Sequence, residues 1–179
     1  MKKHVTLKNG QLLSIRRGEG QDAAKIIAYI QQIAGESDHL TFGSGEFNIT
    51  VEQEVKIIED FQRSANQVYL IAEIDGNVVG NLSFKARGRP RISHTGEFGV
   101  SVLKEYWGIG IGKHLINSLL EWAREGGIIR KINLRVKEDN LQGIALYKQL
   151  GFHEEGKLTR DFHINGKFYD SICMGIHVD

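Results

Sequence analysis

The sequence is poor in cysteine and proline, and neither sign of charge predominates in it. Cys173 is the only cysteine, which excludes a disulfide framework within the chain and a zinc cluster built on thiolates. The seven histidines show no metal-ligand spacing. We therefore expect no metal, and we expect a cytoplasmic protein that works in a reducing compartment.

Charged residues of both signs are mixed along the chain, with 23 Lys and Arg against 22 Asp and Glu. This balance gives little electrostatic support for binding to nucleic acid or to a membrane surface, so neither is an expected partner. Lys2 and Lys3 are not followed by an apolar signal region, and no apolar run approaches the length of a membrane span. The one basic cluster is interpreted as a solvent-exposed hairpin loop and consists of Lys85, Arg87, Arg89 and Arg91.

Hydrophobic periodicity alternates between strand-like and helix-like segments, and no repeat, low-complexity tract or linker interrupts it. The predicted strands are residues 12–16, 69–75, 78–84, 96–103, 131–136, 152–163 and 168–176. The predicted helices are residues 22–35, 50–61, 111–126 and 141–150. Between the first two helices lies an irregular stretch rich in Gly, Ser and Phe, which is typical of a binding loop. The chain is predicted to be one α/β domain, residues 1–179, with a mixed sheet.

The most informative segment is a glycine loop that joins a predicted strand directly to a predicted helix. Gly108, Gly110 and Gly112 remove the Cβ atoms that would hold an anion away from the backbone N–H groups. The helix that follows adds the positive end of its dipole. Two nucleotide-binding patterns do not fit, because Lys113 stands where a dinucleotide fingerprint needs its third glycine and Trp107 where a P-loop needs glycine. The loop is therefore interpreted as a phosphate cradle of another kind.

The loop sequence Trp107-Gly108-Ile109-Gly110-Ile111-Gly112 resembles motif A of the GNAT superfamily, the acetyl-CoA-dependent N-acyltransferases, whose pattern is Q/R-x-x-G-x-G/A. Trp107 replaces the Gln or Arg of that pattern, so only the backbone contacts of the motif carry over to this chain. The resemblance implies that acetyl-CoA is the cosubstrate. Its pyrophosphate would be bound by the N–H groups of Gly108, Ile109, Gly110, Ile111, Gly112 and Lys113.

A second segment resembles motif B of the same family, commonly N-x-x-A-x-x-L-Y-x-x-x-G-F. Here Asn140 and Tyr147 match the motif, while Gly143 stands in place of its first alanine. The two matching residues are seven positions apart and lie on one side of the predicted helix, where both could contact an extended ligand. Two simpler explanations stay open: Asn140 caps the helix, and Tyr147 packs as an ordinary aromatic residue.

The resemblance also implies a GNAT fold, a mixed twisted sheet of about six to seven strands flanked by about four helices. Two central parallel strands, about 96–103 and 130–136, would splay apart at a bulge and admit the pantetheine arm of coenzyme A. Main-chain groups of Val100 and Val102 would hold that arm, and the Val102 N–H would polarise the thioester carbonyl.

Acetyl transfer to an amine requires a base, because a primary amine is almost fully protonated at pH 7. Strand alternation places Glu97 on the face opposite Val100, in the region where GNAT relatives carry their base. Glu97 could instead be a surface carboxylate or a residue that orders the acceptor pocket; Glu73 and His94 are reserve candidates. The resemblance implies that Tyr147 is the general acid for the leaving thiolate.

We therefore predict an N-acetyltransferase that works by direct attack in a ternary complex. The acceptor would be a primary amine on a small molecule, a polyamine, an amino acid or a peptide or protein N-terminus. A noncatalytic acyl-CoA-binding module is the alternative, and a homodimer is allowed because many relatives form one. Four acidic residues could attract a cationic acceptor or could simply be surface carboxylates: Glu46, Glu52, Asp161 and Asp170.

Overall fold

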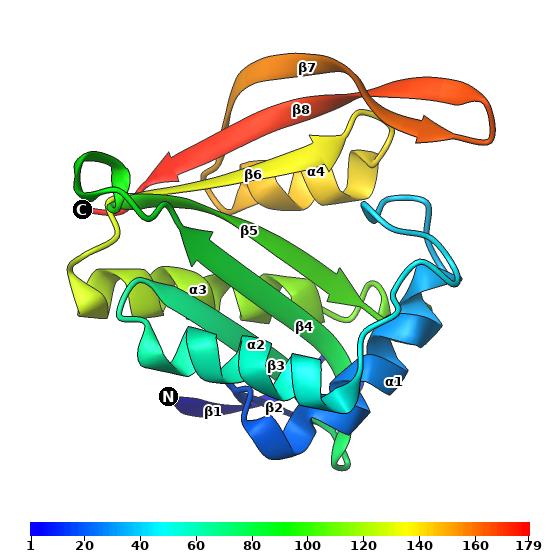
Figure 1. Cartoon of the computed structure of the whole chain (residues 1–179), viewed down its shortest axis with the longest axis vertical. Coiled ribbons are helices and arrows are strands. Elements are labelled where there is room, and N and C mark those ends of the chain that lie inside the picture. Colours follow the sequence, from blue (N-terminus) through cyan, green and yellow to red (C-terminus); the bar gives the residue numbers. More distant parts are fainter.

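The computed structural model describes residues 1–179 and contains an open eight-stranded sheet in the order β1-β2-β3-β4-β5-β6-β8-β7 (Figure 1). Every neighbouring pair is antiparallel except β5 and β6, which run parallel. The strands are β1 Lys2–Thr6, β2 Leu12–Arg17, β3 Gln67–Ile74, β4 Asn77–Ala86, β5 Thr95–Val102, β6 Lys131–Lys137, β7 His153–Ile164 and β8 Lys167–His177.

The sheet has one strand more than the sequence predicts, because β1 carries no clear strand signal. Its sequence, KKHVT, contains a single large aliphatic residue, Val5, and it forms the edge of the sheet against β2. Edge strands need little apolar surface, and lysines are common in them. The register partners across β2, such as Val5 with Leu13, define this strand.

Four α-helices cover the two faces of the sheet: α1 Ala23–Ala34, α2 Val51–Arg63, α3 Ile111–Gly126 and α4 Leu141–Gln149. Helices α1 and α2 lie on one face, where Phe61 packs edge-on against Tyr69 at 5.4 Å between ring centroids. On the opposite face Trp122 of α3 packs against Phe84 at 5.7 Å. A single apolar core therefore spans both faces of the sheet. None of the four helices is both long and apolar enough to cross a membrane.

The ends of two helices follow from local sequence. Helix α2 begins with a capping box, in which the Thr50 side chain accepts from the Gln53 N–H and the Gln53 side chain accepts from the Thr50 N–H. Helix α3 ends at Gly127, whose φ of 63° is the left-handed conformation that favours glycine. Asp22, predicted as the cap of α1, makes no cap hydrogen bond.

Asp22 instead binds Arg16, which joins two carboxylates in a largely buried ion network. The Arg16 Nη1 lies 2.7 Å from Asp22 Oδ2, and its Nε lies 2.8 Å from Glu73 Oε2. The hydrogen bonds from Arg16, opposed by burial, hold the pKa of Asp22 below its ordinary value. The network links β2, β3 and the start of α1, away from the open end of the sheet.

Replacing Arg16 with Met is expected to lower the free energy of unfolding by about 3–5 kcal/mol at pH 7, because two buried carboxylates lose their partner. A group whose folded-state pKa is depressed contributes stability above its unfolded pKa and loses it as the pH falls through the folded value. The deficit of R16M should therefore shrink below pH ~4, the ordinary range of an aspartate. Urea unfolding of the wild type and R16M at pH 7 and below pH ~4 measures the difference in unfolding free energy. An equal deficit of R16M at both pH values would contradict this account.

Candidate functional site

The site begins where β5 and β6 separate. The two strands pair only from Thr95 to Glu97, opposite 131–133, and then diverge, as Figure 1 shows. Beyond that point β5 stays paired with β4 as far as Val102, and β6 stays paired with β8 as far as Lys137. The predicted splay is confirmed, but the predicted bulge is not. Neither ladder of β5 has a register shift, and each of the two strands continues along its outer neighbour, β5 along β4 and β6 along β8.

One edge of β5 is left without a strand partner by this separation. At both ends of the ladder between β4 and β5, an odd-numbered residue on the β5 side forms the hydrogen bond. The Leu103 N–H donates to the Val79 carbonyl, and the Thr95 carbonyl accepts from the Arg87 N–H. Because main-chain groups alternate along a strand, even-numbered residues point the other way. Phe98 and Val100 therefore present their N–H and C=O groups to the gap, and Val102 presents its N–H, while its carbonyl accepts a hydrogen bond from Trp107.

The glycine loop follows at the end of β5 and forms the N-terminus of α3. Gly108 and Gly110 have φ values of 79° and 101°, which only glycine adopts readily. The first helical bond of α3 runs from the His114 N–H to the Gly110 carbonyl. The N–H groups of residues 108–113 consequently have no intrahelical acceptor, and they form no other loop or side-chain hydrogen bond. They make a backbone cradle for an anion at a helix N-terminus.

Trp107, the departure from motif A, ties this loop to the strand. Its indole Nε1 donates to the Val102 carbonyl at 2.7 Å, across the short turn that contains Lys104–Tyr106. The ring itself is half exposed, so its hydrogen bond rather than its burial fixes the turn. The position that carries Gln or Arg in the common motif thus has a structural role in this chain.

Replacing Trp107 with Phe is expected to weaken binding of coenzyme A by about 2- to 10-fold, the equivalent of one net hydrogen bond of ~0.5–1.5 kcal/mol. The loop loses the bond that holds it to the end of β5, while Phe keeps the apolar ring. Isothermal titration calorimetry measures the change. Unchanged affinity would show that the turn holds its shape without the indole.

Helix α4 brings the motif B residues to the same gap. The Asn140 side chain accepts from the Gly143 N–H at 2.9 Å, so the capping role is confirmed. A Cβ at Gly143 would lie 2.8 Å from Asn140 Nδ2, so the capping side chain lies directly against the glycine. Helix α4 lies next to the first turn of α3, since a Cβ at Gly112 would lie 3.6 Å from Leu146.

Tyr147 packs in an aromatic cluster on the α4 side of β5. Its ring lies 6.0 Å from Phe98 and 6.1 Å from Phe152, centroid to centroid. The hydroxyl has no hydrogen-bond partner in the protein, and burial raises the pKa of Tyr147 to about 12. Tyr147 therefore keeps its proton at neutral pH and has it free to donate.

These elements line one cleft of about 1270 Å³. On one side it is bounded by the glycine loop, the open edge of β5 and α4. On the other it is bounded by α1, α2 and the loop between them, including His39, Phe42 and Phe47. The loop expected from its composition to bind a ligand is thus a wall of this cleft.

Glu97 lies in the cleft but is not free. Its carboxylate accepts from Arg135 Nε at 3.0 Å, and Arg135 Nη1 lies 3.7 Å from Asp161. The hydrogen bond that Arg135 donates to Glu97 is the main cause that raises the pKa of Arg135. Both reserve candidates are wrong on geometry: Glu73 is held in the Arg16 network, and neither it nor His94 lines the cleft.

The cleft contains one carboxylate that sequence reasoning missed. Glu54 of α2 is 2% exposed, yet it lines the cleft. Burial raises its pKa, and no hydrogen bond to the carboxylate offsets this. A signal was present in the sequence, because Glu54 shares the spacing of Ile58 and Phe61 on the buried stripe of the helix. A carboxylate on an apolar stripe is more informative than the exposed Glu46 and Glu52.

A chain of polar side chains, also missed, crosses the same side of the sheet. Tyr29 of α1 bonds Ser101 at 2.9 Å, Ser101 donates to Asn81 at 2.7 Å, and Asn81 donates to the Tyr69 hydroxyl at 2.9 Å. Its members come from four elements between positions 29 and 101, so no local pattern reveals them. They form a polar floor beside the open end of β5.

The fold and cleft define a class of protein: a mixed α/β sheet opened between two parallel strands, with an anion cradle at one end of the opening. The sequence model of the acetyltransferase (GNAT) family matches residues 30–152. The solved structure of an acetyltransferase of the GNAT family from Streptococcus pneumoniae superposes with a TM-score of 0.91 at 31% identity, covering 93% of this chain and 99% of the other. This chain belongs to the GNAT acetyltransferase family.

Among curated relatives, the L-amino acid N-acetyltransferase AaaT of Escherichia coli is 34% identical over 105 residues, 59% of this chain and 65% of that protein. A spermidine N(1)-acetyltransferase of Vibrio cholerae is 35% identical over 79 residues, 44% of this chain and 46% of that protein. The chain thus spans less than two thirds of the length of either relative. The two names differ in acceptor, an amino acid in one case and a polyamine in the other.

Proposed function

We propose that this protein is an N-acetyltransferase that transfers the acetyl group of acetyl-CoA to a primary amine in a ternary complex. One observation carries the proposal: a single cleft joins a cradle of free N–H groups to an unpaired strand edge. The cradle suits a pyrophosphate, which needs many donors at a helix N-terminus. The strand edge suits an extended arm with amide groups, which can pair with it as another strand would.

Different parts of the cleft would bind different parts of coenzyme A. The N–H groups of residues 108–113 would bind its pyrophosphate, and main-chain groups of Val100 and Val102 would bind the pantetheine amides. Asn140, whose side-chain oxygen caps α4, would contact the arm through its remaining amide hydrogens. The thioester supplies an acyl group with a stable leaving thiolate. A Val102 N–H aimed at its carbonyl would stabilise the charge that develops during attack.

Tyr147 would serve as the general acid. Its free, protonated hydroxyl lies in the cleft within an apolar cluster, where a donated hydrogen bond is strong. A leaving thiolate, with an ordinary thiol pKa near 8.5, gains from such a donor.

Glu97 would act on the acceptor side. Its ion pair with Arg135 holds the carboxylate in place at the cleft. A carboxylate held in this way can accept the amine's proton through water or order the acceptor, the two roles that the sequence leaves open. Both would be performed from β5, next to the open strand edge.

The proposal is tested by release of free CoA thiol from acetyl-CoA across a panel of L-amino acids, polyamines, aminoglycosides and peptides. We expect thiol release that requires an amine and yields the N-acetyl product by mass spectrometry. Coenzyme A binding without thiol release for any amine would instead support a noncatalytic acyl-CoA-binding module. The single domain of residues 1–179 and the homodimer remain predictions, which sedimentation and limited proteolysis can test.

A further inference from the structure

The half of the cleft opposite Tyr147 has an open polar floor. On this face of β4 and β5 the register pairs are Asn81 with Ser101, Ser83 with Gly99 and Lys85 with Glu97. A Cβ at Gly99 would meet no atom within 4 Å, so the centre of the floor is empty above the strand. This empty centre lies beside the unpaired edge of β5, where an acceptor must approach the acyl group.

Glu54 borders this floor as a buried carboxylate with no protein partner. It is 2% exposed, and neither a hydrogen bond nor an ion pair reaches its oxygens. Because Glu54 lines the cleft, a ligand bound there can reach its carboxylate. A largely buried carboxyl group without a protein partner in a cleft is typical of a functional site, and an ammonium group of a ligand would supply the missing partner.

The Tyr69 hydroxyl also lacks a hydrogen-bond partner that a ligand could supply. In the polar chain Ser101 donates to Asn81 and Asn81 donates to Tyr69, so the Tyr69 oxygen is used as an acceptor. Its own proton has no acceptor in the protein. Phe61, which lies on the same buried stripe of α2 as Glu54, packs against the Tyr69 ring at 5.4 Å between centroids, and Glu54 and Tyr69 both line the cleft. A ligand in this half of the cleft would complete the hydrogen bonding of both groups. The pKa of Tyr69 is raised mainly by burial and in part by the charge of Glu54, in agreement with this placement.

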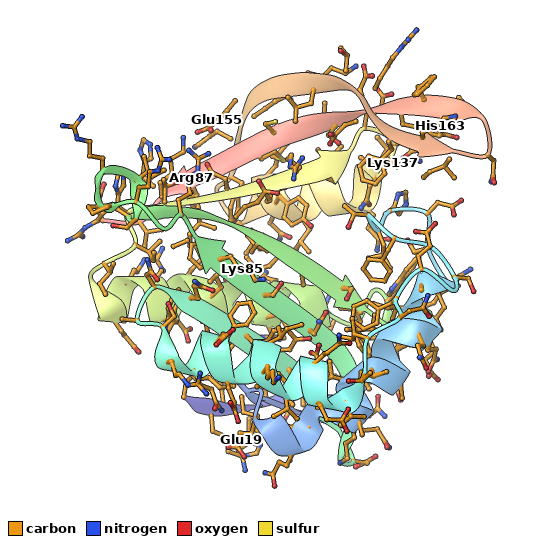
Figure 2. All side chains as sticks on the ribbon, in the orientation of Figure 1. Glu19, Lys85, Arg87, Lys137, Glu155 and His163 are labelled. Atoms are coloured by element: carbon orange, nitrogen blue, oxygen red, sulfur yellow. The ribbon has the colours of Figure 1, made fainter.

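Lys85 adds a charge of the opposite sign. Its ammonium makes no ion pair, lies 5.1 Å from the centre of the Phe61 ring and lines the cleft, and Figure 2 shows it on β4 at the side covered by α2. It is close enough to Glu54 to lower the pKa of that carboxyl, yet no salt bridge joins them. In contrast, Arg135 is already paired with Glu97. A ligand with charges of both signs can pair with Glu54 and Lys85, since both residues line the cleft.

We propose that Glu54 binds the ammonium group of the acceptor and Lys85 binds an acidic group on the same molecule, so that the acceptor is a small zwitterion of the amino acid type. This inference rests on the proposed function and narrows its substrate class. The apolar side chain of such an acceptor would face Ile30, Ile33 and Ile57, which line the same half of the cleft.

The test uses pairs of acceptors that differ only in the acidic group: L-leucine with 3-methylbutylamine, and L-phenylalanine with 2-phenylethylamine. In the wild type we expect the amino acid to have the lower KM. E54Q should raise the KM of both members of a pair by about tenfold or more, the value of a hydrogen bond to a charged group. K85M should raise the KM of the amino acid alone. The KM of acetyl-CoA should not change in either variant.

Asp60→Asn is the matched control, because it makes the same carboxylate-to-amide change at an exposed position of α2. Calorimetric binding of the best amino acid to the protein loaded with CoA gives a readout apart from activity, and thermal melting shows whether E54Q is folded. Lys85 is exposed, so K85M tests the idea even if E54Q does not fold.

The outcomes separate this inference from the proposed function. If the wild type is active, two results would overturn the zwitterion site alone. One is an acceptor KM that E54Q leaves unchanged. The other is an equal effect of K85M on the KM of the amino acid and of the amine in each pair. A lower KM for spermidine or for the decarboxylated amines than for any amino acid would also overturn it. Absence of thiol release with every amine would overturn the proposed function instead.

Discussion

Replacing Tyr147 with Phe is expected to lower turnover by about 100-fold or more, the usual contribution of a general acid. Phe keeps the ring that packs against Phe98 and Phe152, so the cluster and the fold should be preserved. Only the hydroxyl is lost, and in the free protein it bonds to nothing. Steady-state kinetics and calorimetry together should therefore show a large loss of kcat with unchanged affinity for acetyl-CoA.

The control for Y147F is Tyr106→Phe, which removes another tyrosine hydroxyl that lines the cleft. Tyr106 lies in the turn before the glycine loop, and no step of the proposed mechanism uses it. Y106F should keep turnover within about twofold of the wild type. Similar turnover in Y147F and wild type would remove Tyr147 from the mechanism and leave it as a packing residue.

Replacing Gly110 with Val is expected to weaken binding of coenzyme A by about 10- to 100-fold, because a β-branched residue at a positive φ costs ~1–3 kcal/mol. Gly110 caps α3 with a φ of 101°. The loop can relieve that strain only by rotating the backbone, which turns the N–H groups of the cradle away from a common point. Calorimetric titration with coenzyme A measures the loss.

Gly76→Val is the matched control for the strain itself. Gly76 has a φ of 78° in the turn between β3 and β4, and a Cβ there would meet no atom within 4 Å. G76V should lose stability to a similar extent as G110V but bind coenzyme A normally. Equal losses of affinity in the two variants would mean that general destabilisation, rather than the cradle, governs binding.

The parts of the site that could be predicted from the sequence are those that local chemistry determines. The glycine loop is recognisable because a tight turn with free N–H groups needs glycines at set positions, and the left-handed Gly108 and Gly110 bear this out. The cap of α4 is likewise local, since Asn140 reaches only three residues along the chain. The capping box of α2 and the termination of α3 follow the same rule.

The parts that sequence reasoning missed depend on contacts between distant segments. Lys85 belongs to a basic cluster for which the sequence predicts an exposed loop. It lies instead on β4 and lines the cleft, because the strand continues past Phe84 to Ala86. The bond from Trp107 to the Val102 carbonyl spans a turn whose shape no motif specifies. Glu97 could be placed on the correct face, whereas its pairing with Arg135 needed the register of β5 and β6.

The central claim is that free N–H groups at the start of α3 and the unpaired edge of β5 together bind coenzyme A. Isothermal titration of the purified, folded protein with coenzyme A and with pantetheine, which lacks the pyrophosphate, tests it most directly. The account predicts one coenzyme A per chain and at least about tenfold weaker binding of pantetheine, because charge-assisted bonds to the cradle are lost. No detectable binding of coenzyme A, or equal affinity for both ligands, would contradict it.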